Sequence, residues 1–185
     1  MPEEKRENFF TELLKLIVIA AIIVFPVRLF VAQPFIVSGA SMDPTFENGQ
    51  YLIVDELTYR LKNPERGDVI IFRPPRAPKE FYIKRIIGLP GETLTIEGGD
   101  VYIANQGGKR QLDEPYIQNQ GNGGNASYAI GEGQYFVMGD NRPESSDSRV
   151  WGLLPRENIV GRAFVRLLPV NSLSILPGSA PYLGQ

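Results

Sequence analysis

Ser41 and Lys84 are the residues of this chain whose types and surroundings best suit covalent catalysis. The 185 residues include no histidine and no cysteine. A Ser-His-Asp triad, a thiol nucleophile, a disulfide and a metal site built on His or Cys are therefore excluded. The remaining route to an acyl-enzyme is a serine activated by a lysine, a recurring variant of the triad. The chain offers one candidate for each role, and no metal or other cofactor is expected.

Ser41 follows Gly39 and Ala40 at the end of an apolar stretch, and an Asp-Pro-Thr sequence comes soon after it. Small residues before the serine let a substrate backbone come close, and a strand end presents the hydroxyl from a stiff element. Pro44 fixes the backbone just beyond. An ordinary loop serine is the commoner explanation of such a residue taken alone, so Ser41 becomes a nucleophile candidate only with a suitable base.

Lys84 lies in the middle of a predicted strand over residues 81–87. Strand alternation places it on the same face as Tyr82 and Ile86, and turns Arg85 to the opposite face. A lysine base must be neutral, and desolvation lowers the lysine pKa. A shift from ~10.4 to ~8 corresponds to roughly 3 kcal/mol. We therefore expect hydroxyl groups around Lys84 and no Asp or Glu in contact; a solvated lysine is the alternative.

Residues 9–30 differ in character from the rest of the chain, because Leu16 to Val27 is apolar and uncharged. As a helix this segment is about 33 Å long, against a hydrocarbon core of about 30 Å. Lys15 and Arg28 stand at its ends, where long side chains can reach the headgroups. A cleaved signal peptide is the alternative, although a small residue three places before the cut is missing. We expect a membrane-spanning anchor over residues 9–32.

The distribution of Lys and Arg predicts the orientation of this anchor. Basic residues precede or enter the apolar run, whereas after Arg28 the next Lys or Arg is Arg60. The positive-inside rule then places residues 1–8 in the cytoplasm and residues 33–185 on the extracytoplasmic side.

The chain after the anchor has the pattern of an all-β domain, with short alternating runs separated by turn residues. Nineteen glycines and 15 prolines fit many turns. Residues 118–127, polar and Gly-rich, and residues 140–149, charged, are predicted loops. A hairpin is expected to turn at Gly98-Gly99. The predicted strands are residues 35–37, 50–56, 68–72, 81–87, 93–96, 101–104, 135–138 and 159–167.

The net charge of −2 carries no electrostatic footprint for nucleic acid. A length of 185 residues allows one domain of ordinary size with a real core. The composition therefore favours a single extracytoplasmic domain behind the anchor.

Five features in order resemble the bacterial-type signal peptidase I family, the membrane-anchored Ser/Lys endopeptidases that remove signal peptides from exported proteins. The first is the N-terminal anchor. The others are SGASMDPT at residues 38–45, RGDVI at 66–70, YIKRIIGLPGE at 82–92, and GDNR at 139–142 continuing through Ser145, Asp-Ser-Arg and Trp-Gly.

This resemblance implies Ser41 as the acylating nucleophile and Lys84 as the general base. It implies that the Ser145 hydroxyl hydrogen-bonds and orients the lysine. Two ion pairs are expected to brace the site, namely Asp140 with Arg85 and Asp147 with Arg149.

The resemblance also implies that the substrate lies as an added strand between residues 35–39 and the strand around Lys84. Shallow apolar pockets that admit only small side chains explain cleavage after Ala-x-Ala. The implied substrate-binding residues are Phe35, Val37, Gly39, Met42, Tyr82 and Ile83.

The chain departs from the family pattern at two places. Some members carry, two residues before the nucleophile, a serine that helps to bind the oxyanion; here Gly39 stands there. The Ser41 N–H remains one donor and Ser38 is the candidate second donor, since losing a donor costs ~100-fold or more. Pro143-Glu144 replaces an Asp-Asn that many relatives carry.

We therefore expect a mainly β protein, with a single N-terminal transmembrane helix and an all-β catalytic domain of coiled, partly barrel-like antiparallel sheets. The expected partners are signal-peptide-bearing preproteins, membrane lipid and the protein-export translocon. One alternative is a self-cleaving peptidase of the SOS-repressor type, which the anchor and residues 140–149 argue against. Others are a pilus or conjugation processing peptidase and a catalytically idle preprotein-binding relative. The presence of both Ser41 and Lys84 argues against an idle protein.

Overall fold

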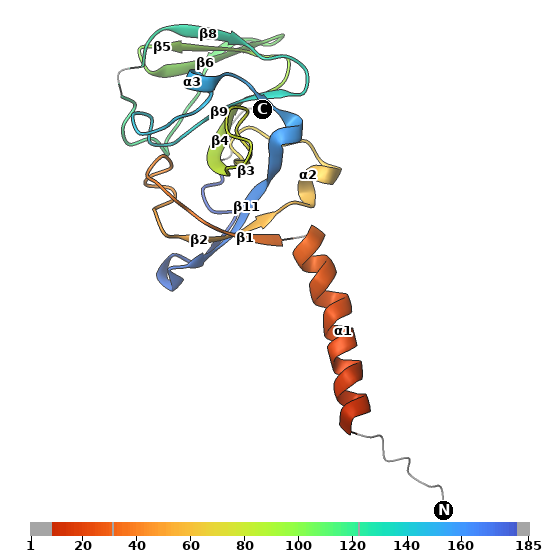
Figure 1. Ribbon diagram of the computed structural model, residues 1–185. Helices are drawn as coiled ribbons and strands as arrows, with labels where there is room; N and C mark the ends of the chain where they lie inside the picture. Colours follow the sequence, from red (N-terminus) through yellow and green to blue (C-terminus); the bar gives the residue numbers. More distant parts are fainter. Residues whose placement is uncertain (1–8, 31, 122, 181–185) are drawn as a thin grey trace, which may run out of the picture.

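The computed structural model describes residues 9–30, 32–121 and 123–180 (Figure 1). Helix α1 (Phe9–Phe30) extends away from a body of antiparallel sheets, which begins with strand β1 (Ala32–Ile36). The predicted cytoplasmic residues 1–8 lie outside the described part. The mainly β fold predicted for the rest of the chain is confirmed.

Helix α1 falls on the segment predicted as an anchor. Within the described residues, however, no helix is both long enough and apolar enough to cross a membrane. The anchor therefore stays a prediction.

An eight-stranded antiparallel sheet forms most of the body, and it curls into a half-barrel. Its order is β1-β2-β11-β3-β4-β9-β10, with β12 paired to β11. Register shifts in the pairings of β11 and β9 mark local irregularities of the kind that bend strands. The strands after β1 are β2 (Tyr51–Asp55), β3 (Val69–Phe72), β4 (Tyr82–Gly88), β9 (Gln134–Met138), β10 (Leu154–Pro155), β11 (Ile159–Leu168) and β12 (Ser174–Ile175).

A second sheet of four strands, in the order β7-β6-β5-β8, lies at the end of the body farthest from α1 (Figure 1). The predicted hairpin at Gly98-Gly99 is confirmed, and both glycines have positive φ values of 61° and 103°. Residues with a side chain rarely adopt this left-handed conformation. The strands are β5 (Thr93–Glu97), β6 (Asp100–Asn105), β7 (Gly108–Gln111) and β8 (Ala126–Ala129).

Three apolar clusters fill the body. One joins the small sheet to β9 through Phe136 and Met138. Another includes Met42 and Phe46, directly after the serine of interest, packed with residues of β2 and β3. Burial of these two side chains fixes the segment that carries Ser41.

All eight predicted strands are present, with ends that differ from the prediction by at most three residues. Strand β8 begins inside the predicted loop 118–127. Its side chains are half-buried or exposed, and backbone pairing with β5 defines the strand. Helix α3 begins at Ser148, inside the predicted loop 140–149, because the Asp147 side chain accepts from Arg149 N and caps the helix. The short helical elements are α2 (Thr58–Leu61), α3 (Ser148–Trp151), and the 3₁₀ turns η1 (Arg156–Asn158) and η2 (Val170–Ser172).

Gly161 allows β11 to pass close to β2, and we predict that alanine there destabilises the fold. A Cβ at this position lies 2.8 Å from Val54 Cγ1 and 2.9 Å from the Asp55 carbonyl carbon. Overpacking of this kind costs about 1–3 kcal/mol, so urea unfolding of Gly161→Ala should show that loss. Gly124→Ala is the matched control, since a Cβ there has nothing within 4 Å. Equal unfolding midpoints for the two variants would contradict this account.

Candidate active site

The structure brings Ser41 and Lys84 into direct contact. Lys84 Nζ donates to Ser41 Oγ at 2.6 Å and to the Ile83 carbonyl oxygen at 2.9 Å. Lys84 stands in β4 opposite Ile70 of β3, and only 4% of it is exposed. Two residues that are 43 positions apart in the sequence thus form a hydroxyl–amine pair in which the amine is shielded from solvent.

The surroundings of Lys84 favour its neutral form. Burial is the largest influence and lowers the Lys84 pKa to about 8, with the charge of Arg149 acting in the same direction. The charges of Asp147 and Asp140 raise it, but less than burial lowers it. Among the described residues no carboxylate forms an ion pair with Lys84. With a pKa of about 8, about a tenth of the Lys84 amine is uncharged at pH 7 and about half at pH 8.

The segment carrying Ser41 is held by Asn141, which sequence reasoning did not single out. Asn141 N donates to the Ser41 carbonyl oxygen at 3.1 Å, and Asn141 Nδ2 donates to the Ala40 carbonyl oxygen at 3.0 Å. On the other side, Met42 is buried in the core. The nucleophile candidate is thus fixed by both backbone and side-chain contacts.

Gly39 has a structural reason to be glycine. Its φ is +93°, in the left-handed region that favours glycine, and its N–H donates to Asn48 Oδ1 at 3.0 Å. In the described part of the chain the Ser41 N–H has no hydrogen-bond acceptor, whereas the Gly39 N–H is occupied. Of the two amides, Ser41 is the one available to a bound oxyanion. Ser38 is exposed and lines the pocket that also contains Ser41 and Lys84.

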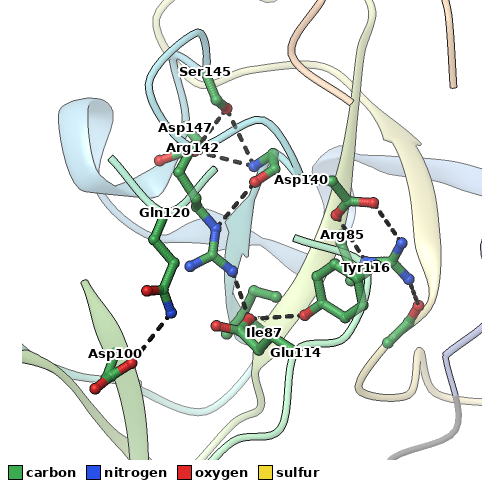
Figure 2. A network of polar contacts seen from close by, with 12 residues as sticks. Arg85, Ile87, Asp100, Glu114, Tyr116, Gln120, Asp140, Arg142, Ser145 and Asp147 are labelled. Atoms are coloured by element: carbon green, nitrogen blue, oxygen red, sulfur yellow. Dashed lines mark hydrogen bonds and ion pairs between the residues drawn. The ribbon is translucent and has the colours of Figure 1, made fainter. Parts of the chain in front are cut away.

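The structure does not bring Ser145 into a hydrogen bond with Lys84, contrary to the expected role. The Ser145 hydroxyl donates to Asp147 Oδ2 at 2.7 Å and accepts from Gly139 N at 3.1 Å (Figure 2). A buried carboxylate is a strong hydrogen-bond acceptor, and Asp147 accepts the hydrogen bond from the Ser145 hydroxyl. Ser145 therefore links the Gly139 backbone to Asp147 and helps to hold the loop beside the site in place.

The two expected arginine–carboxylate pairs are both formed. Arg85 and Asp140 are fully buried and meet in a bidentate pair, with Nε to Oδ1 at 2.8 Å and Nη2 to Oδ2 at 2.6 Å (Figure 2). Arg149 meets Asp147 in the same way, at 2.8 Å for both contacts. Thr45 Oγ1 also donates to Asp140, which ties this pair to the segment after Ser41.

An apolar groove of about 610 Å³ leads to the serine and the lysine. Five of the predicted substrate-binding residues line it, namely Phe35, Val37, Gly39, Tyr82 and Ile83. Met42 does not; it is only 1% exposed and packs in the core beneath the nucleophile segment. Ile36, within the predicted edge 35–39, also lines the groove. Lining residues that sequence reasoning missed are Leu52, Ile71, Glu80, Phe81, Glu144 and Ser146.

Two strand edges border this groove. β1 is the terminal strand of the large sheet, and within the described residues its one pairing is with β2. Residues 82–84 of β4 pair with β3 on one side, while the pairing with β9 begins only at Arg85. An extended peptide can therefore hydrogen-bond as an added strand between these edges.

Comparisons with known proteins identify the family of this chain. Residues 10–168 match the family model of signal peptidase, peptidase S26, so the chain belongs to this family, which indicates a protease. The resemblance predicted from the motifs is confirmed.

Relatives match over most of their length. A probable signal peptidase I-2 of Synechocystis sp. is 40% identical over 183 residues, covering 96% of this chain and 82% of that protein. Signal peptidase IB of Staphylococcus aureus is 34% identical over 171 residues, covering 83% and 86%. A crystal structure of a signal peptidase I from Enterococcus faecalis V583 aligns at 33% identity with a TM-score of 0.47, over 55% of this chain and 97% of that one.

We predict that Asp140→Asn destabilises the fold by about 3–5 kcal/mol, because it removes the carboxylate that pairs with the buried Arg85 guanidinium. Urea unfolding measures the loss. Glu97→Gln is the control, since Glu97 pairs with Lys109 at 2.6 Å with both side chains about half exposed, and such pairs contribute only about 0–1 kcal/mol. A loss for Asp140→Asn no larger than the control would contradict the bracing role.

Proposed function

We propose that this protein is an endopeptidase that removes N-terminal signal peptides from exported preproteins, cutting after a small-x-small motif such as Ala-x-Ala. The reaction runs through an acyl-enzyme on Ser41, with neutral Lys84 as the general base. The observation that carries this proposal is the 2.6 Å contact between a buried amine and a groove-lining hydroxyl. Family membership supports the substrate class.

Acylation begins when the lone pair of neutral Lys84 takes the Ser41 hydroxyl proton as Oγ bonds to the scissile carbonyl carbon. The carbonyl oxygen becomes an oxyanion in the tetrahedral intermediate. When the C–N bond breaks, the Lys84 ammonium returns the proton to the leaving amine. Lys84 then deprotonates a water molecule, which attacks the ester, and the ammonium formed returns this proton to Ser41 Oγ as the ester C–O bond breaks.

The oxyanion requires preorganised donors. The Ser41 N–H, which is without an acceptor among the described residues, is the first. The Ser38 hydroxyl is proposed as the second, because Ser38 lines the groove near the nucleophile and the Gly39 N–H is held by Asn48.

The groove supports selection of small side chains. Its walls are apolar, with Phe35 and Val37 from the β1 side and Ile83 from β4. Phe35 packs edge to face on Phe81 at 5.1 Å between ring centroids, which narrows the groove between the two strand edges. A substrate strand between these walls has room for alanine-sized side chains, and larger ones must displace packed rings.

We further propose a single-pass membrane location, with residues 1–8 cytoplasmic, residues 9–32 as the anchor, and residues 33–185 as the extracytoplasmic catalytic domain. Exposed apolar side chains support a lipid surface as partner, and they gather where β11 ends, near the side of the body from which α1 departs (Figure 1). They are Leu168, Val170, Leu173 and Ile175. The protein-export translocon is the proposed source of substrates.

Cleavage of a preprotein by the full chain in detergent or lipid vesicles tests the proposal. Ser41→Ala and Lys84→Ala should each lower kcat/KM by about a thousandfold or more. Lys84→Arg should not restore it, because arginine stays protonated. Lys109→Ala is the matched control for loss of a lysine, and N-terminal sequencing of the product locates the cut. Cleavage that survives either the Ser41 or the Lys84 substitution would overturn the assignment.

The pH dependence gives a second prediction. Burial lowers the Lys84 pKa to about 8, so the amine is neutral above that pH and protonated below it. We expect kcat/KM to be half-maximal near pH 8 and to fall about tenfold per pH unit below it, since only the neutral amine accepts the Ser41 proton. A profile of kcat/KM from pH 6 to 9 measures this; a flat profile would contradict the role of Lys84.

A further inference from the structure

Arg142 lies in the loop that follows β9, beside the nucleophile, and it connects this loop to the segment between β7 and β8, outside the large sheet. Its side chain is almost fully buried, and Nη2 donates to Glu114 Oε1 at 2.5 Å (Figure 2). Glu114 lies in the segment between β7 and β8 and is also buried. A buried guanidinium requires a charged partner, so Glu114 determines where the Arg142 side chain can lie.

Arg142 in turn holds Gly139 beside the nucleophile. Arg142 Nε donates to the Gly139 carbonyl oxygen at 3.2 Å, while Gly139 N donates to both Ser145 Oγ and Asp147 Oδ2 at 3.1 Å. Gly139 is thus held by hydrogen bonds through both its N–H and its carbonyl oxygen. It also touches the nucleophile segment closely, because a Cβ on Gly139 would collide with the Ser41 carbonyl oxygen. A displacement of Gly139 toward Ser41 would therefore push on the nucleophile segment.

Glu114 reaches the site by a second route. Tyr116 OH donates to Glu114 Oε1 at 2.8 Å, and the Tyr116 ring lies 3.9 Å from the Arg85 guanidinium carbon (Figure 2). Arg85 pairs with Asp140, which accepts a hydrogen bond from Thr45, four residues after the nucleophile. The Glu114 carboxylate thus contacts both chains of interactions that lead to the nucleophile segment, one through Arg142 and the other through Tyr116.

We propose that Glu114 is a positioning residue for catalysis: through Arg142 and Gly139 it sets the place of Ser41 relative to Lys84. Glu114 lines no part of the catalytic groove and acts only through its neighbours. This inference rests on the proposed function.

The expected effect of Glu114→Gln is a kcat about tenfold to a hundredfold lower, the size of loss that a misplacement of about 1 Å produces. KM should change little, because the residues of the groove are untouched. The acid limb of the pH profile should also move to higher pH, since a looser loop admits water to Lys84.

The experiment uses the full chain with a preprotein substrate and measures kcat, KM and the pH profile. Glu97→Gln is the matched control: it removes a carboxylate from an exposed ion pair of the small sheet and should leave all three unchanged. Thermal unfolding and near-UV circular dichroism report whether each variant is folded at the assay temperature.

A double variant, Glu114→Gln with Arg142→Met, separates positioning from stability and serves if the single variant does not fold. Replacing both members of a buried pair is far less disruptive than removing one. We expect this folded protein to have a low kcat as well, because Arg142→Met removes the hydrogen bond from Arg142 to the Gly139 carbonyl oxygen.

The outcomes are distinct. A folded double variant with the kcat of the unmodified chain would overturn the inference. The Glu114–Arg142 pair would then contribute to the stability of the fold and not to catalysis. So would a folded Glu114→Gln protein with unchanged kcat, or with a raised KM alone. A folded but inactive unmodified chain would overturn the proposed function and this inference with it.

Discussion

The proposed reaction depends on one constraint: Lys84 must be able to lose its proton next to a hydroxyl while many charges lie nearby. Burial of Lys84 favours the neutral amine, but a carboxylate in contact would restore its charge. The nearby carboxylates are instead each taken by an arginine, as Asp140 is by Arg85 and Asp147 is by Arg149. Arginine keeps its proton at any working pH and binds both carboxylate oxygens. The buried ion pairs therefore leave Lys84 without a counter-ion, in addition to bracing the loop.

Strand β4 serves both sides of this arrangement. Alternation directs Lys84 to the groove and Arg85 to the opposite side, where Asp140 lies. The strand also changes partners along its length: residues 82–84 leave one edge free beside the groove, and β9 covers the strand from Arg85 onward. A single strand thus supplies the proposed base, the proposed docking edge for substrate and the main ion pair behind them.

Much of this could be predicted from the sequence, and the failures have physical reasons. The strands with strong alternation were all found, and the opposite directions of Lys84 and Arg85 follow from a period of two. Ser145 and Met42 lie in turns, where no periodicity indicates the direction of a side chain. The hydroxyl of Ser145 therefore turned to the buried carboxylate of Asp147, and Met42 turned to the core.

Glu114 was missed for another reason. Its partner Arg142 is 28 residues away, and both stand in turn-rich segments between strands. Pairings of this kind arise only when the two sheets are placed against each other, so local patterns do not reveal them. The same holds for Asn141, whose contacts to residues 40 and 41 span about a hundred positions.

The turn before the nucleophile explains why glycine occupies position 39. A φ of +93° there is strained for any residue with a Cβ, and the N–H is already directed to Asn48. A serine at this position would have to change the backbone that presents Ser41 before its hydroxyl could help an oxyanion. In this chain the conformation of the turn and a side-chain donor at position 39 exclude each other. The second donor must then come from elsewhere in the groove, which is why the proposal places it on Ser38, outside the strained turn.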